Sequence, residues 1–380
     1  MLFNQFKKQM RSIFNIKTST VEVFKFFDQK ELRRDSWLDY DKGISIILVS
    51  FRHAYESIVN TGFDVARYPI LEYFNVFLFG FRMPLFFIAS GIFFSSSLAK
   101  KGLGKYTTVR VQNILYPMLI WGSIQLTLQL VFSGYTNIKF GPREYISLIT
   151  DPRRTGQFWY LNALFFVGVL YSVMKTKLKL NVYSQLLLGL LMFFSVAKFR
   201  QHEIYLGFIM DILQYYLFFA VGDLLATFIK SESSKKFLSS YRLLFFLIPI
   251  FLVVQYIFAD INIFYQSNYY VEHKMPLFFL LVAFVGCLLS FNIAFILNAS
   301  NKARYLSVIG YHSIYIFCMQ IIIMAGVRII LVKIFMFTSV PLLLPILLFS
   351  GLILPIVVYK LCVRMKMQWL FTLSPIAAKR

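Results

Sequence analysis

Long apolar stretches, separated by short segments of mixed polarity, run along most of this chain of 380 residues. A helix that crosses a bilayer needs about 20 mostly apolar residues. The pattern therefore predicts an all-α integral membrane protein with about ten membrane-spanning helices. Their approximate ranges are 42–60, 72–96, 109–133, 157–174, 180–198, 211–229, 242–259, 276–298, 305–331 and 337–359.

Charged residues weaken the first and the ninth of these predicted spans. The first is the weakest in hydropathy, because it contains Arg52, His53 and Glu56, and the ninth is interrupted by Arg328. The longest connecting segment, 134–156, holds several glycines and prolines. We expect this segment to carry a re-entrant or surface element.

The composition supports a membrane protein. The chain is 58% hydrophobic and 15% charged, with a mean hydropathy of +0.67, whereas a soluble domain is roughly 45–50% apolar and about 25% charged. The formal net charge of +22 would indicate nucleic-acid binding in a soluble protein. No basic helix or aromatic RNA-binding motif stands out, so we expect no nucleic-acid partner. The charge is better explained by loops that set topology and contact the lipid bilayer.

The distribution of lysine and arginine predicts the orientation. Placing both termini in the cytoplasm puts most of these residues in cytoplasmic segments, as the positive-inside rule requires. Arg153 and Arg200 then belong to outer loops. The predicted organisation is a basic N-terminal segment at 1–38, a membrane domain at 39–360 and a basic cytoplasmic tail at 361–380. The first segment is expected to be an amphipathic surface helix or a disordered arm.

The first predicted span contains a candidate catalytic pair. His53 lies eleven residues after Lys42, which is about 16 Å deeper along a regular helix. Glu56 follows His53 at i+3 and shares its face, whereas Arg52 points away from it. A carboxylate beside a histidine fixes the imidazole tautomer, as a general base requires. The alternative is that Arg52 and Glu56 lie near the outer interface and extend toward water.

The second predicted span reads "FRMPLFFIASG". Pro84 is expected to kink this helix, and the small residues 89–91 permit close contact with another helix. Arg82 needs a partner in this setting, which Glu56 or Glu72 could supply.

Basic residues gather before the third predicted span. Lys100, Lys101, Lys105 and Arg110 precede a helix N-terminus, which adds partial positive charge and free N–H groups. This combination suits a phosphorylated ligand in the cytosol. Ordinary topology-determining charge explains Lys100 and Lys101 equally well, so Arg110 is the strongest candidate.

The sequence predicts no metal site. The three cysteines, Cys287, Cys318 and Cys362, show no paired spacing. His202, His273 and His312 show no metal-ligand spacing with a cysteine or a carboxylate.

Several stretches together resemble a known family. The segments "WLDYDKGISIILVSFRHAY", "FRMPLFFIASGIFF", "KYTTVRVQNILYPMLIW", "FWYLNALF", "YYLFFAVGDLL" and "IGYHSIYIF" occur in this order. They are similar to the membrane-bound acyltransferase 3 family, especially its fucose 4-O-acetylase-like members. The resemblance covers about residues 37 to 330. Its strongest match is "MPLFF-x3-G", and its second strongest is "KGI…H".

The resemblance implies ten helices, a cytoplasmic donor such as acetyl-CoA, and acyl transfer to a hydroxyl, usually of a glycan. It maps the family's first-helix histidine to His53 and a basic residue, typically arginine, to Lys42. The family's Arg-x-x-Arg before the third helix falls on Arg110 and Asn113, so only the first arginine is kept. Two frequent histidines are replaced, one by Arg82 and one by Gln320.

These observations lead to one principal hypothesis, a membrane O-acyltransferase. Acyl-CoA, most simply acetyl-CoA, would bind with its phosphates near Arg110, Lys105 and Lys42, and Asn113 would complete the donor site. The acceptor would be a glycan or a lipid-linked sugar, and the expected location is the inner or plasma membrane of a bacterium.

In this hypothesis His53 is the general base toward the acceptor hydroxyl, and Glu56 orients its imidazole. Arg82 or Arg52 would stabilise the oxyanion that develops. The residues alone do not distinguish direct transfer from an acyl-histidine intermediate.

Two alternatives remain. A polytopic exporter of a polysaccharide or polyprenyl-linked sugar would also use many helices, aromatic residues and buried charges, although no internal repeat typical of transporters is visible. A catalytically silent scaffold is the second alternative, and Asn113 and Gln320 motivate it.

Overall fold

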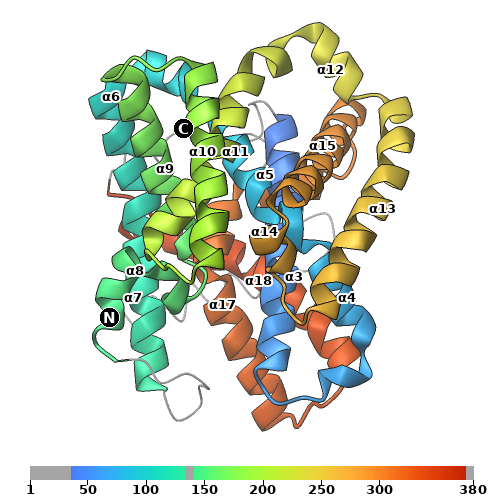
Figure 1. The fold of residues 1–380 in the computed structure, drawn as a ribbon. Helices are drawn as coiled ribbons and strands as arrows, with labels where there is room; N and C mark the ends of the chain where they lie inside the picture. Colours follow the sequence, from blue (N-terminus) through green and yellow to red (C-terminus); the bar gives the residue numbers. More distant parts are fainter. Residues whose placement is uncertain (1–35, 133–140, 374–380) are drawn as a thin grey trace. The chain divides into compact units, whose positions relative to one another are not determined.

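A computed structural model describes residues 36–132 and 141–373, and all secondary-structure elements within these ranges are helices (Figure 1). The helices are α3 (Ser36–Val59), η2 (Val65–Arg67), α4 (Pro69–Phe77), α5 (Phe79–Ile92), α6 (Phe94–Arg110), η3 (Val111–Leu115), α7 (Tyr116–Val131), α8 (Glu144–Thr150), η5 (Pro152–Thr155), α9 (Trp159–Thr176), α10 (Val182–Gln201), α11 (Phe208–Lys230), α12 (Glu232–Leu238), α13 (Tyr241–Phe264), α14 (Tyr270–Lys274), α15 (Pro276–Ser300), α16 (Arg304–Tyr311), α17 (Ser313–Ile329), η6 (Ile330–Ile334), α18 (Val340–Arg364) and η7 (Gln368–Leu370).

The all-α membrane architecture is confirmed. Eight helical stretches of the described residues are long and apolar enough to cross a membrane. Their ranges are Pro69–Ile92, Phe94–Val131, Val182–Gln201, Phe208–Lys230, Tyr241–Phe264, Pro276–Ser300, Ser313–Ile334 and Val340–Arg364.

The two other predicted spans, 42–60 and 157–174, are also helical, as α3 and α9, but neither is among these eight. Helix α3 carries several charged side chains, and α9 begins with polar and aromatic residues. The count of ten and the cytoplasmic termini therefore stay predictions. The segment proposed for 1–38 lies almost wholly outside the described residues, as does the end of the tail at 361–380.

Helix α11 forms the centre of the packing and contacts α5, α9 and α10. It crosses α5 closely at two glycines. A Cβ atom at Gly91 would lie 2.1 Å from the carbonyl oxygen of Phe219, and one at Gly222 would lie 2.2 Å from that of Ile88. The small residues 89–91 therefore allow the close helix contact that the sequence predicts.

Helices α8 and η5 pack into the protein. Leu148 of α8 and Pro152 and Thr155 of η5 are buried, and Gln157 just after them is 2% exposed. This backbone path brings η5 against the N-terminal end of α9. Arg153 of η5 is thereby partly buried and lines a cavity.

Candidate active site

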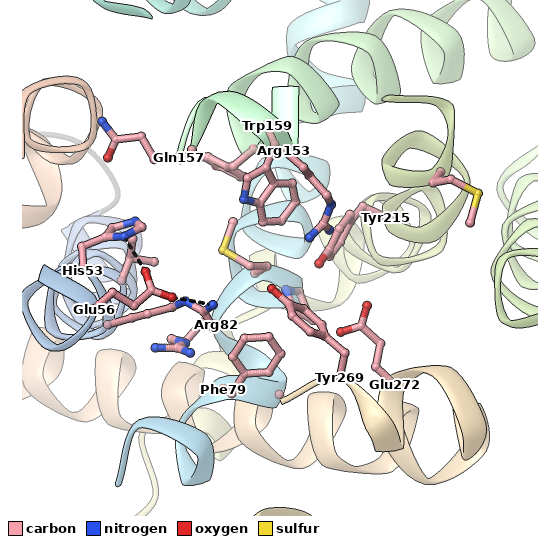
Figure 2. Close-up of a pocket in the computed structure, with 18 of the residues that line it drawn as sticks. His53, Glu56, Phe79, Arg82, Arg153, Gln157, Trp159, Tyr215, Tyr269 and Glu272 are labelled. Carbon is pink, nitrogen blue, oxygen red and sulfur yellow. Dashed lines mark ion pairs between the residues drawn. The ribbon is translucent and has the colours of Figure 1, made fainter. Parts of the chain in front are cut away.

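A cavity of about 590 Å³ lies among the helices. Its lining comes from α3, α5, α9, α10, α11, α14, α15 and α17 and from η5. Figure 2 shows His53, Glu56, Arg82 and Phe79 toward one end and Trp159, Arg153, Tyr215, Tyr269 and Glu272 toward the other. Most of the lining is apolar or aromatic, as in many ligand cavities, and the charged side chains are set among these residues.

Helix α3 contributes a histidine, a carboxylate and an arginine. His53 Nδ1 lies 3.3 Å from Glu56 Oε2, and Arg52 Nη2 lies 2.6 Å from Glu56 Oε1. Local helix geometry explains both contacts, because i+3 and i+4 neighbours share a face. When Nδ1 carries the proton toward Glu56, the imidazole lone pair is on Nε2. Arg52 contacts Glu56 and also lines the cavity.

Arg82 of α5 is 2% exposed. Its Nη1 donates to the carbonyl oxygen of Leu48 at 3.2 Å and to Asn75 Oδ1 at 3.4 Å. Among the described residues it forms no ion pair, so the expectation that Glu56 or Glu72 would be its salt-bridge partner is wrong. Glu56 instead contacts Arg52 through Oε1 and His53 through Oε2.

The far end of the cavity holds an arginine stacked on an aromatic ring. The Arg153 guanidinium lies 4.1 Å from the Trp159 ring centroid and donates to Asp211 Oδ1 at 2.7 Å. Burial disfavours the charged guanidinium, but the Asp211 carboxylate outweighs this and raises the pKa of Arg153. This cation is therefore fully neutralised by a protein carboxylate.

A second ion pair lies beside it. Arg200 Nη1 donates to Glu272 Oε1 at 2.8 Å, and Gln214 donates to the same oxygen. Burial alone would raise the pKa of Glu272, but Arg200 and the neighbouring cations lower it. Burial and Arg200 also lower the pKa of His273 to about 4, so this imidazole is neutral at pH 7.

Buried glutamines form a hydrogen-bonded layer next to the cavity. Gln320 Nε2 donates to Gln157 Oε1 at 3.3 Å, and Gln157 Nε2 donates to Gln125 Oε1 at 3.4 Å. Ser50, one turn before His53 on α3, donates to Gln320 Oε1. Gln320 is thus part of a packed polar network.

The predicted donor residues are not brought together in one cavity. Lys42 and Lys105 line neither of the two cavities described here. Arg110 lies in the helical body, where it donates to Tyr106 Oη at 3.0 Å and to the carbonyl oxygen of Leu164. Their donor-binding roles stay predictions.

Asn113 lines a second, smaller cavity of about 220 Å³. Tyr315, Tyr359 and Cys318 also line it, and Thr372 donates to Asn113 Oδ1 at 3.3 Å. Gln157 donates to the carbonyl oxygen of Cys318 at 3.5 Å, so the glutamine layer contacts the walls of both cavities.

Sequence patterning missed the far end of the larger cavity. Arg153 and Arg200 were assigned to outer loops, and Glu272 lies in a short segment between two predicted spans. Two features of the sequence could have indicated this part of the cavity. Arg153 is close to Trp159 in the chain, and Asp211 lies near the start of an apolar stretch. Within residues 36–132 and 141–373, no group of three or more metal-ligating side chains is placed to hold a metal ion.

Comparison with known proteins places the chain in a family. A family model described as an acyltransferase domain matches residues 35–360. The nodulation protein NolL of Mesorhizobium japonicum is 27% identical over 152 residues, which are 40% of this chain and 38% of that protein. NolL of Sinorhizobium fredii is 28% identical over 205 residues, which are 53% of this chain and 51% of that protein. The chain thus spans about half or less of the length of these relatives. No solved structure matches it.

Proposed function

The chain belongs to the acyltransferase 3 family, and on this basis we propose that it is a membrane O-acyltransferase that moves an acyl group from acyl-CoA to a hydroxyl of a glycan or lipid-linked sugar. The observation that carries the proposal is the pairing of His53 with Glu56 in the wall of a cavity large enough for a sugar. The proposed location is the inner or plasma membrane of a bacterium.

The reaction uses His53 as a general base. Nε2 takes the proton of the acceptor hydroxyl while the hydroxyl oxygen attacks the thioester carbonyl of the donor. The tetrahedral intermediate then collapses, the carbon–sulfur bond breaks, and the imidazolium returns its proton to the leaving thiolate. Glu56 holds the Nδ1 proton and stabilises the imidazolium that forms between these steps.

The negative charge on the tetrahedral oxygen requires a donor in the same cavity. Arg52 and Arg82 are the two candidates, because both line the cavity beside His53. Each guanidinium has a buried nitrogen without a hydrogen-bond partner among the described residues, Nη1 in Arg52 and Nη2 in Arg82. A donor of this kind acts strongly in a water-poor site.

Acyl-CoA is proposed to approach from the cytoplasmic side, with its phosphates near Arg110, Lys105 and Lys42. Asn113 in the second cavity completes this set. The glutamine layer contacts the walls of both cavities, and Gln320 in it accepts from Ser50, one turn before His53 on α3. The thioester would therefore pass close to this layer to reach the base.

The acceptor end of the cavity suits a sugar. Trp159, Tyr215 and Tyr269 line it, and aromatic faces pack against the C–H faces of sugar rings. The charged pairs Arg153–Asp211 and Arg200–Glu272 supply hydrogen-bonding groups beside these rings. Both relatives are named nodulation proteins.

Replacing His53 with alanine tests the proposal. Transfer of radiolabelled acetyl from acetyl-CoA to cell-surface glycan in membrane vesicles should fall by about 10²- to 10⁴-fold. The matched control is His202→Ala, since His202 is exposed and lies outside the cavity. Equal transfer by wild type and His53→Ala would reject the mechanism. Movement of glycan across the vesicle membrane without donor consumption would instead identify an exporter.

A further inference from the structure

The charged groups of the larger cavity do not balance. Four arginines line it, namely Arg52, Arg82, Arg153 and Arg200. Three of them have a carboxylate partner within 2.8 Å. The pairs are Arg52–Glu56, Arg153–Asp211 and Arg200–Glu272. Arg82 alone among these four forms no ion pair with the described residues. One buried positive charge is therefore left over.

This remaining cation is deeply buried. Arg82 is 2% exposed, and its two protein acceptors are both neutral, the carbonyl oxygen of Leu48 and the side-chain oxygen of Asn75. Both accept from Nη1, whereas Nη2 is buried without a partner. Glu56 acts on Arg82 only through space and is itself paired with Arg52. A buried cation without an ion-pair partner is costly, and an anionic ligand in the cavity would offset that cost.

The surroundings of Arg82 fit an oxyanion such as a carboxylate or a phosphate. The guanidinium carbon of Arg82 lies 5.0 Å from the Phe79 ring centroid, and that of Arg52 lies 4.8 Å from the same centroid. Stacking on one ring restricts both guanidinium planes. Nη2 of Arg82, which has no partner among the described residues, is then available to donate to a carboxylate or a phosphate.

We infer that the acceptor carries a permanent negative charge, a carboxylate or a phosphate ester, and that Arg82 binds it. The inference rests on the proposed function, because it describes the acceptor of that reaction. It also gives the two arginines different roles, because Arg82 binds the acceptor and Arg52 donates to the transient oxyanion. The acceptor is thus an acidic sugar or a sugar on a phosphate-bearing lipid carrier, and a neutral free glycan binds weakly.

Asn75 gives a way to neutralise Arg82 without removing it. Its side-chain oxygen lies 3.4 Å from Arg82 Nη1, and the residue is 3% exposed. Asn75→Asp has nearly the same shape and adds a carboxylate beside the guanidinium. An internal carboxylate would compete with the anion of the acceptor, so the variant should lose the preference for anionic acceptors while Arg82 stays in place.

The experiment measures kcat and KM for acetyl transfer by the full chain in detergent with three acceptors. One is a neutral oligosaccharide, one is the same oligosaccharide with a terminal uronic acid, and one is the neutral oligosaccharide on a polyprenyl diphosphate. The variants are Arg82→Gln and Asn75→Asp. Arg67→Gln is the control, because Arg67 pairs with Asp64 on the exposed surface.

Wild type should favour one of the two anionic acceptors by about tenfold to a hundredfold in kcat/KM, mostly through KM. Arg82→Gln and Asn75→Asp should reduce this ratio to near one, and Arg67→Gln should keep it. The favoured anionic acceptor identifies the source of the charge. If Arg82→Gln does not elute as a folded species, Asn75→Asp carries the test.

Three outcomes would overturn the inference. Equal use of all three acceptors by wild type removes it and leaves the proposed function standing. A fall in kcat of the same size for every acceptor in Arg82→Gln places Arg82 at the oxyanion instead. Absence of both acetyl transfer and donor consumption in wild type removes the proposed function, and the inference with it.

Discussion

His53 Nδ1 lies 3.3 Å from Glu56 Oε2, one turn along the same helix. The contact joins the proposed base to a carboxylate that also accepts an ion pair from Arg52 at 2.6 Å. A carboxylate in this position fixes the imidazole tautomer and favours the protonated imidazole that arises during the reaction. The catalytic value of His53 should therefore depend on Glu56.

Glu56→Gln should lower kcat for acetyl transfer by about tenfold to a hundredfold, with the donor KM nearly unchanged, because only the charge that supports the imidazolium is removed. The measurement is steady-state transfer from radiolabelled acetyl-CoA. Glu72→Gln is the matched control, since Glu72 is exposed on α4 and lies outside the cavity. An unchanged kcat in Glu56→Gln would rule out the proposed partnership.

The helices could be predicted from sequence because their signal is local. The predicted spans 211–229, 242–259 and 276–298 fall within α11, α13 and α15, since a long apolar run is sufficient to define such a helix. The pairing of His53 with Glu56 was equally accessible, because residues three apart on a helix share a face.

The remainder of the cavity could not be predicted in this way. Arg153 and Glu272 come from short segments between longer helices, and tertiary packing alone brings them to the same cavity. The expected pairing of Arg82 with Glu56 or Glu72 was wrong because tertiary packing also determines the contacts of Arg82. Arg82 donates to Leu48 of α3 and Asn75 of α4, and such contacts between helices depend on tertiary packing, which the spacing of residues does not encode.

The glutamine layer should contribute to stability. Gln157→Leu would remove the acceptor of Gln320 Nε2 and the donor to Gln125 Oε1, leaving buried amide groups unpaired. We expect a loss of about 1–3 kcal/mol in the free energy of unfolding, measured by denaturant titration in mixed micelles. Gln129→Leu is the control, because Gln129 Oε1 is already buried without a hydrogen-bond partner. Equal stabilities for the two variants would contradict a structural network.

The crossing of α5 and α11 should not tolerate a methyl group. Gly222→Ala would place a Cβ atom 2.2 Å from the carbonyl oxygen of Ile88, so the helices would have to separate, at a cost of about 1–3 kcal/mol. Gly104→Ala should instead be neutral or slightly stabilising, since no atom lies within 4 Å of its added Cβ atom. Thermal unfolding in detergent compares them, and an unchanged midpoint for Gly222→Ala would contradict the close crossing.

The short helix α14 contains a group whose titration should be visible in stability. Burial and Arg200 lower the pKa of His273 from its ordinary value of 6.5 to about 4, whereas Glu272 acts in the opposite direction. Arg153 and Lys274 also lower the pKa. The stacked ring of Tyr269, 5.7 Å away between centroids, covers one face of the imidazole.

The sign of the pH effect follows from these values. Between pH 6.5 and about 4 the unfolded chain binds a proton at His273 and the folded protein does not, so acidification over this interval favours unfolding. His273→Gln removes this contribution. As the pH falls from 6.5 to 4, the melting temperature of wild type should therefore decrease relative to that of His273→Gln. Above pH 7 the difference between the two melting temperatures should be constant. His202→Gln, at an exposed position, should show no such trend relative to wild type. A wild-type curve parallel to that of His273→Gln across the interval would show that the imidazole titrates near its ordinary pKa and is accessible to water.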